Sequence, residues 1–164
     1  MICCGIDPGL DGALAVIEDG PNGGCKCFDM PTLALSRGGK NKHEVDAHAL
    51  ADLIAQWMPH HAFLEGARAM PGQGDTSTFA IGKGYGIVIG VLAASSIPYT
   101  IVDARRWKNA LQVPKDKDAA RARASQLLPA AASQWPLKKH DGRAEAALIA
   151  LYGSRSLAGI GRAA

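Results

Sequence analysis

Short apolar runs, separated by turn-forming residues, recur along this chain. They predict five strands, over residues 2–6, 13–18, 25–30, 61–65 and 97–102. Pro8-Gly9 and the glycine-rich segment 20–24 predict tight reversals between the first three strands, because proline fixes one turn position and glycine permits the next. The chain is therefore expected to begin with a meander of three strands.

Helical periodicity appears after residue 45. It predicts helices over 46–58, from 77 or 79 to 95, from 103 through 111, over 116–128 and from 141 to 153. Asp103 is expected to cap its helix, and Pro59 and Pro129 to end theirs. Segments 31–44 and 66–75 are rich in glycine and polar residues, which predicts mobile loops.

The order of these elements predicts a mixed α/β fold with one five-stranded sheet and helices on both faces. A chain of 164 residues with 48% hydrophobic composition can bury the core of one such domain. The second helix is unusual because glycines interrupt it, at positions 82, 84, 86 and 90. Glycines at intervals of four let two backbones approach closely, either helix on sheet or subunit on subunit.

Acidic residues stand at the ends of predicted elements. Asp7 ends the first strand and Glu65 the fourth, each directly before a turn or a glycine. Asp141 and Glu145 are four apart at the start of the last helix, a spacing that brings Cβ atoms within about 5–6 Å of each other on one face. Carboxylates from separate segments are the oxygen ligands that hard cations such as Mg²⁺ require. These four residues are the candidate metal ligands.

Each of these acids also has a structural interpretation. A carboxylate at a strand end is often a solvated turn residue. Asp141 fits the first turn of a helix, where the helix dipole favours a negative charge, and Glu145 fits an ion pair with Arg143 or a solvated position.

Charge distribution says more than the net charge of +3. Basic residues collect between positions 105 and 143, around the final acidic pair: Arg105, Arg106, Lys108, Lys115, Lys117, Arg121, Arg123, Lys138, Lys139 and Arg143. Such a cluster can neutralise phosphates, and it is also the ordinary solvated face of a soluble protein. Carboxylates inside a basic neighbourhood favour the first interpretation, because a nuclease needs both.

The sequence gives less support to a zinc site, a disulfide or a membrane span. Cys3-Cys4 and Cys25/Cys27 lack the two-residue gap of zinc knuckles, so reduced thiols in a cytosolic protein are expected. The sequence shows no apolar run of the ~18 residues that a membrane span needs, and no secretory signal is expected at the N-terminus.

Three motifs in order resemble the RuvC family of Holliday-junction resolvases, most of all its compact phage-type members. They are Gly5-Ile6-Asp7-Pro8-Gly9, the strand end Phe63-Leu64-Glu65, and the segment 138–153, which runs from Lys138-Lys139-His140-Asp141 through Glu145 to Tyr152-Gly153. The resemblance extends from Ile2 to about Gly153. It implies a ribonuclease H-like fold with strand order 3-2-1-4-5, a nuclease domain over residues 1–153 and a short tail over 154–164.

The resemblance also implies an activity. A crossover junction endodeoxyribonuclease would use Asp7, Glu65, Asp141 and Glu145 to hold two Mg²⁺ ions, or Mn²⁺ in their place, with Asp7 shared between the ions. Its substrate would be branched DNA, meaning four-way junctions and forks, and a homodimer in the cytoplasm, without a membrane partner, is expected. Residues expected to meet DNA are Arg68, Met70, Arg105, Arg106, Lys108, Lys115, Lys117, Arg121, Arg123, Lys138, Lys139, His140 and Arg143.

The chain departs from the family pattern at two places. Bacterial members commonly end with two aspartates three residues apart, whereas Asp141 and Glu145 are four apart. The aromatic wedge after the fourth strand is also missing, and Arg68 and Met70 stand in that loop. Three alternative functions therefore remain: a nuclease for RNA or RNA–DNA hybrids, a nucleic-acid-binding module without catalysis, and an actin-like nucleotide-binding fragment.

Overall fold

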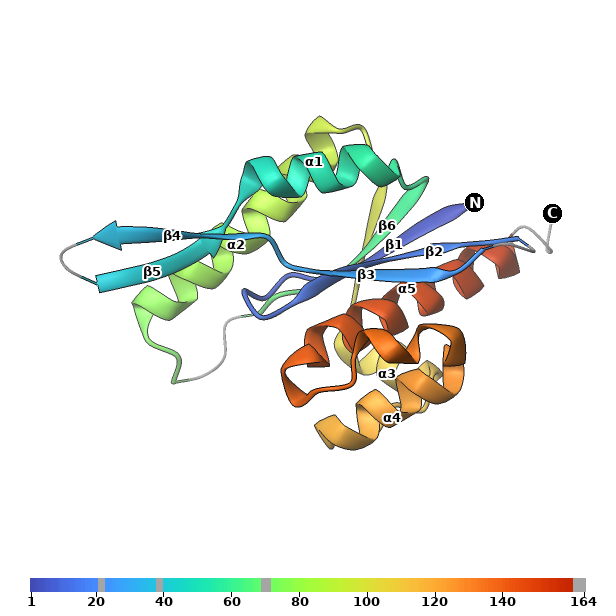
Figure 1. Cartoon of the computed structure of the whole chain (residues 1–164). Helices are drawn as coiled ribbons and strands as arrows, with labels where there is room; N and C mark the ends of the chain where they lie inside the picture. The colour runs from blue at the N-terminus through green and yellow to red at the C-terminus, as the bar shows by residue number, and fades with distance from the viewer. Residues whose placement is uncertain (21–22, 38–39, 69–71, 161–164) are drawn as a thin grey trace.

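The computed structural model describes residues 1–20, 23–37, 40–68 and 72–160. A five-stranded sheet in the order β3-β2-β1-β6-β7 forms its centre (Figure 1). The strands are β1 (Ile2–Asp7), β2 (Ala13–Glu18), β3 (Cys25–Asp29), β6 (His61–Glu65) and β7 (Tyr99–Val102). The meander β1-β2-β3 is antiparallel, while β6 is parallel to both β1 and β7. The predicted fold class is confirmed, and the order 3-2-1-4-5 holds when only the strands of this sheet are counted.

Five α-helices follow or separate the strands. They are α1 (Ala47–Trp57), α2 (Asp75–Ala94), α3 (Ala104–Ala110), α4 (Lys117–Leu127) and α5 (Asp141–Ile160), with 3₁₀ turns at Pro129–Gln134 and Lys138–His140. The side chains of Asp46, Asp103 and Asp116 accept backbone N–H groups at the starts of α1, α3 and α4. The predicted cap at Asp103 is thus confirmed, and these caps satisfy backbone donors that a helix start leaves free.

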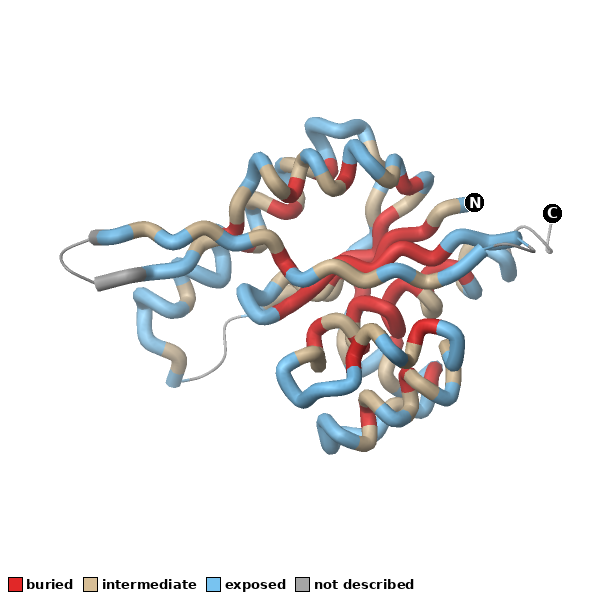
Figure 2. Tube along the Cα trace, in the orientation of Figure 1, coloured by how far each residue is buried: buried red, intermediate tan, exposed pale blue. Residues whose placement is uncertain are grey.

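Helices cover both faces of the sheet, α1 and α2 on one side and α3, α4 and α5 on the other (Figure 1). Neighbouring residues of a strand point to opposite faces, so Cys3 packs in the core beneath α5 while Cys4 packs in the core beneath α1 and α2. Figure 2 shows that the central strands are the most buried part of the molecule. The sheet is therefore a rigid platform, and the ends of its strands fix the positions of the residues that follow.

Segment 31–44 contradicts its prediction as a mobile loop. It forms most of a two-stranded antiparallel ribbon, β4 (Thr32–Arg37) and β5 (Lys40–Val45), that extends away from the central sheet (Figure 1). Half-buried Leu33 and Leu35 alternate with exposed Ala34 and Ser36, a period of two that glycines and basic residues in the sequence obscured. Residues 38–39, between the strands, lie outside the described part of the chain.

Small residues let α5 lie unusually close to β1. A Cβ atom at Gly5 would come within 2.2 Å of the backbone nitrogen of Ala150 and 2.3 Å of the carbonyl oxygen of Ala146. Gly153 is packed in the same way, since its Cβ would come within 2.1 Å of the Phe63 ring. The prediction that the last helix ends at Gly153 is therefore wrong. Helix α5 continues to Ile160. Beyond Gly153, Ser154 donates a hydrogen bond to Asp19 at 3.1 Å.

We expect Gly5→Ala to destabilise the fold by about 3 kcal/mol or more, because the new methyl group overlaps backbone atoms that cannot rotate away. Urea unfolding of wild type and variant measures this difference. Gly24→Ala is the matched control, since a Cβ at Gly24 meets nothing within 4 Å. Equal unfolding midpoints for the two variants would show that β1 and α5 can separate without cost.

Helix α2 exposes much of its apolar surface. Val88 and Leu92 are buried against the rest of the protein, whereas the Phe79 side chain is 74% exposed. By length and composition α2 is the one helix in the described part of the chain that could cross a membrane, a property that the sequence prediction overlooked and that is weak evidence by itself. An apolar helix face without a partner instead points to an interaction surface.

Candidate active site

Asp7 and Glu65 lie side by side at one edge of the sheet. Each is the last residue of its strand, and the parallel pairing of Ile6 with Leu64 brings the two strand ends together. The Pro8-Gly9 turn folds back beneath Asp7, whose carboxylate accepts the Gly9 N–H at 3.3 Å. The carboxyl edge of parallel strands is where α/β folds commonly bind ligands.

Helix α5 brings a third carboxylate to this edge and α3 brings a cation. Lys108 Nζ donates to Glu145 Oε1 at 2.8 Å, with the two side chains about a quarter to a third exposed. The indole of the neighbouring Trp107, which is fully buried, donates to Glu65 Oε2 at 2.7 Å. Two consecutive residues of α3 therefore hold two of the acids.

The pKa values of these groups show that they interact. Burial, and then the negative charges of Glu145 and Glu65, raise the pKa of Asp7 to about 6, although the Gly9 N–H and Lys108 act in the opposite direction. Burial also raises the pKa of Glu65, against the hydrogen bond from Trp107. Burial alone would lower the pKa of Lys108, but the three carboxylates together raise it. Three acids thus share the positive charge of Lys108, and the cluster attracts further positive charge.

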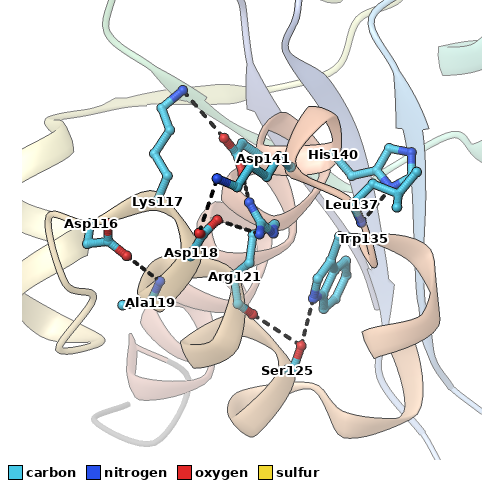
Figure 3. A network of polar contacts seen from close by, with 11 residues as sticks. Asp116, Lys117, Asp118, Ala119, Arg121, Ser125, Trp135, Leu137, His140 and Asp141 are labelled. Carbon is cyan, nitrogen blue, oxygen red and sulfur yellow. Dashed lines mark hydrogen bonds and ion pairs between the residues drawn. The ribbon is translucent and has the colours of Figure 1, made fainter.

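Asp141 takes part in a separate network of ion pairs (Figure 3). Arg121 donates to Asp141 Oδ1 at 2.5 Å and to Asp118 Oδ1 at 2.6 Å, and its side chain is only 14% exposed. Lys117 approaches Asp141 Oδ2 at 3.5 Å. Of the four predicted ligands, the structure therefore brings three together, and it pairs the fourth with arginine.

Packing at Gly142 explains why the final acids are four residues apart. A Cβ at this position would come within 2.5 Å of the Asp11 carbonyl oxygen and 2.9 Å of Gly12, so α5 touches the backbone of the β1–β2 turn. A carboxylate three residues before Glu145 would have to occupy that contact. The acid stands instead at position 141, one residue earlier, where Arg121 can reach it.

Two cavities meet at Asp7. The first, which we call the α2 cavity, has a volume of about 700 Å³ and is lined by Asp7, Pro8, Gly9, Leu10, Val45, Glu65, Gly66, Ala67, Arg68, Ser77, Ala80, Ile81, Gly84, Tyr85, Asp103, Ala104 and Arg105. The second, the α5 cavity, has a volume of about 490 Å³ and is lined by Asp7, Gly9, Leu10, Asp11, Gly12, Lys117, Lys138, Lys139, Asp141, Gly142 and Glu145. Asp7 is common to both, and Asp141 and Glu145 open onto the second.

Of the predicted DNA-contacting residues, Lys108 is paired with Glu145, and most of the others fall into two groups. Those whose side chains hold the fold together are Arg121, Arg123, which donates to the Leu111 carbonyl at 2.9 Å, and Arg143, which pairs with Asp29 at 2.5 Å. His140 accepts the backbone N–H of Leu137 at 3.4 Å. Exposed residues with a basic side chain are Arg68, Arg105, Arg106, Lys115, Lys117, Lys138 and Lys139. Arg68 nevertheless pairs with Asp103 at 2.8 Å, and Met70 lies outside the described residues.

Sequence reasoning assigned neither Trp107 nor Lys108 to the acidic site, and gave Arg121 a role toward DNA. Their contacts join residues 20 to 42 positions apart, and no local pattern encodes such pairs. The sequence signal for the start of α3 was the Asp103 cap, which fixes where the helix begins and hence which residues reach Glu65 and Glu145.

The fold is shared with solved structures of junction resolvases. RuvC of Thermus thermophilus bound to a Holliday junction superposes with a TM-score of 0.63 at 13% identity, over 95% of this chain and 96% of that one. A second RuvC structure from the same organism gives 0.60 at 14%, over 95% and 96% of the chains. The yeast mitochondrial Holliday junction resolvase Ydc2 gives 0.57 at 15%, over 95% and 78%. No protein-family model matches this sequence, and no curated protein matches it either.

Proposed function

We propose that this protein is a metal-dependent endonuclease that resolves Holliday junctions and other branched DNA. The observation that carries the proposal is the meeting of Asp7, Glu65 and Glu145 at the carboxyl edge of a sheet whose fold is that of RuvC. The raised pKa of Asp7 indicates that its charge is poorly compensated by the protein alone. A cation at this point would relieve that repulsion.

The donor set suits Mg²⁺ or Mn²⁺ in its chemistry, because all the candidate ligands are carboxylate oxygens. Within the described ranges of the chain, no three His, Cys, Asp or Glu side chains form a ready-made metal cluster. Lys108 binds Oε1 of Glu145 and Arg121 binds Oδ1 of Asp141, so a metal ion at these acids would compete with both cations. Asp7 and Glu65 would hold one ion and Asp7, Glu145 and Asp141 the other; ions bound there activate water and stabilise the leaving oxygen.

The direct test is cleavage of a four-way junction with Mg²⁺, compared with Mg²⁺-free buffer, a linear duplex of the same sequence and an RNA–DNA hybrid. We expect paired nicks in the junction only. Preference for the hybrid would support the ribonuclease alternative, and binding without cleavage would support a non-catalytic module. Binding of ATP without either would point to the actin-like alternative.

The DNA path across α3 can be tested by salt dependence. Arg105 and Arg106 are exposed on α3, and Arg105 lines the α2 cavity. If both meet phosphates, Arg105→Ala with Arg106→Ala should reduce the log–log salt slope of junction affinity by about 1.8, which is about 0.9 for each charge. Arg155→Ala, at the exposed far end of α5, is a matched control. An unchanged slope in the double variant would exclude α3 from the DNA path.

Symmetric cleavage of two strands of a junction suits an enzyme with two active sites, and we propose that α2 provides the contact of a homodimer. Its outward face carries exposed Phe79 and three glycines, Gly82, Gly86 and Gly90, at which a Cβ would meet nothing within 4 Å. A second backbone can therefore approach closely. Gly86→Arg should convert the dimer to a monomer in light scattering at micromolar concentration, whereas Gly24→Arg should not. A monomeric wild type would contradict the proposal.

A further inference from the structure

Two kinds of residue line the α2 cavity. Asp7 and Glu65 supply carboxylates, which belong to the proposed catalytic centre. Leu10, Ile81 and Tyr85 supply apolar and aromatic side chains. The proposed hydrolysis of a phosphodiester needs only the carboxylates. The apolar side chains have no role in that chemistry.

Two of these apolar side chains are exposed. Leu10 is 42% exposed and Ile81 is 39% exposed, although both line a concave surface. Exposed apolar side chains that together line a concave surface mark a binding site more often than a single exposed apolar side chain on a convex surface. A volume of about 700 Å³ lies within the ~300–1,000 Å³ of small-ligand pockets, which are mostly apolar with a few polar groups. Ser77 and Tyr85 supply such polar groups through their hydroxyls.

We propose that the α2 cavity receives an unstacked nucleobase from the DNA strand that is cleaved. The inference rests on the proposed nuclease function, which places a phosphate at Asp7 and Glu65. A nucleotide attached to that phosphate has its base within reach of the adjoining cavity, and Arg105 at the rim can meet the next phosphate. A base has flat apolar faces for Leu10 and Ile81 and polar edges for Ser77.

Branched DNA makes such a base available. Unstacking and unpairing a base cost free energy in a duplex, and least where the strand is already distorted, as at the point where a junction exchanges strands. Stacking on an aromatic side chain offsets part of that cost, and Tyr85 is the aromatic residue that lines the cavity. The cavity would therefore favour cleavage next to a distorted position over cleavage within a continuous helix. It couples the shape of the DNA to the position of the phosphate.

The test fills the cavity and leaves the acids intact. Ala80 lines the α2 cavity, and Ala80→Trp puts an indole where the base would lie; Ala94→Trp, at the exposed end of the same helix, is the matched control. Junctions carrying 2-aminopurine at successive positions around the exchange point are bound in Ca²⁺, and their fluorescence is recorded. We expect one position to become unstacked with wild type and with Ala94→Trp, and not with Ala80→Trp.

Cleavage and affinity complete the test. Ala80→Trp should slow junction cleavage about tenfold or more, the loss of one base–protein contact. Its junction affinity should stay within about threefold, because backbone contacts dominate binding. Ile81→Ala, which removes one wall, should give a smaller loss of the same kind if Ala80→Trp does not fold.

The outcomes separate the two proposals. A wild type that cleaves junctions, with Ala80→Trp equal to it in rate and fluorescence, overturns the base pocket and leaves the nuclease standing. If wild type cleaves no junction, the nuclease fails, and titration with nucleoside 5′-monophosphates still tests the cavity. Shifts of the Leu10 and Ile81 methyl signals in NMR spectra, abolished by Ala80→Trp, would then support a base site, and unshifted signals would overturn it.

Discussion

Asp7→Asn is expected to abolish junction cleavage, by at least about a thousandfold, because it removes the charge that both metal positions would share at almost constant shape. Junction binding should persist, and without divalent ions it should improve as a negative charge leaves the site. Single-turnover cleavage and gel-shift binding measure the two effects. Asp52→Asn, an exposed site on α1, is the matched control. Wild-type turnover by Asp7→Asn would remove Asp7 from the catalytic centre.

The same substitution has an opposite effect on stability. The pKa of Asp7 is about 6 in the folded protein against 3.8 ordinarily, so between these values the folded state binds more protons than the unfolded state. The free energy of unfolding therefore falls as pH rises through this window, and above it the Asp7 carboxylate costs the fold on the order of 1–3 kcal/mol. Without divalent ions, Asp7→Asn should be more stable than wild type at pH 8.

Unfolding at low pH is the control for this effect on stability. Below pH 3.8 the Asp7 carboxyl is protonated in both states, so wild type and Asp7→Asn should unfold at nearly the same urea concentration. Mg²⁺ should stabilise wild type at pH 8 and leave the variant unchanged, since binding to the folded state adds stability. A wild type that is already the more stable protein at pH 8 without metal would mean that Lys108 fully compensates the acids.

Local signals in the sequence predicted the five strands of the central sheet and the positions of Asp7 and Glu65 at strand ends, whereas the strand order came from the resemblance to RuvC. A strand that runs into Asp7-Pro8-Gly9 ends there because proline and glycine enforce the turn, and the parallel strand that ends at Glu65 must finish at the same edge. The Asp103 cap was equally readable, since capping depends on residues two and three positions away.

What the sequence could not show depends on packing. Glycine often follows the last turn of a helix, yet Gly153 lies inside α5. Glycine is needed at this position because the Phe63 ring leaves no room for a side chain. Lys108 and Arg121 belong to a basic cluster in the sequence, yet each is paired with a different acid of α5. Charge counts along a chain cannot separate a cation that meets DNA from one that holds a carboxylate, because that choice is made by the distances between elements.

The ranking of the two acids on α5 follows from those pairings. Glu145 interacts electrostatically with Asp7, and Lys108 is its ion-pair partner among the described residues; Asp141 is bound by Arg121 and approached by Lys117. We therefore expect Glu145→Gln to slow cleavage about a hundredfold or more, and Asp141→Asn only about tenfold. Single-turnover rates over a Mg²⁺ titration measure both, with calorimetry for metal affinity.

Matched controls distinguish a ligand from a structural partner. Glu18→Gln, at the exposed end of β2, controls for the change of glutamate to glutamine. Asp118→Asn removes the other acid that Arg121 holds, and it lines neither cavity. If Asp141 acts only by fixing Arg121, then Asp141→Asn and Asp118→Asn should lose stability and rate alike. If Asp141→Asn is instead as slow as Asp7→Asn and raises the Mg²⁺ concentration needed for cleavage, Arg121 must release Asp141 when metal and DNA bind. The ranking would then be wrong, and the second ion would depend on the Asp141 carboxylate.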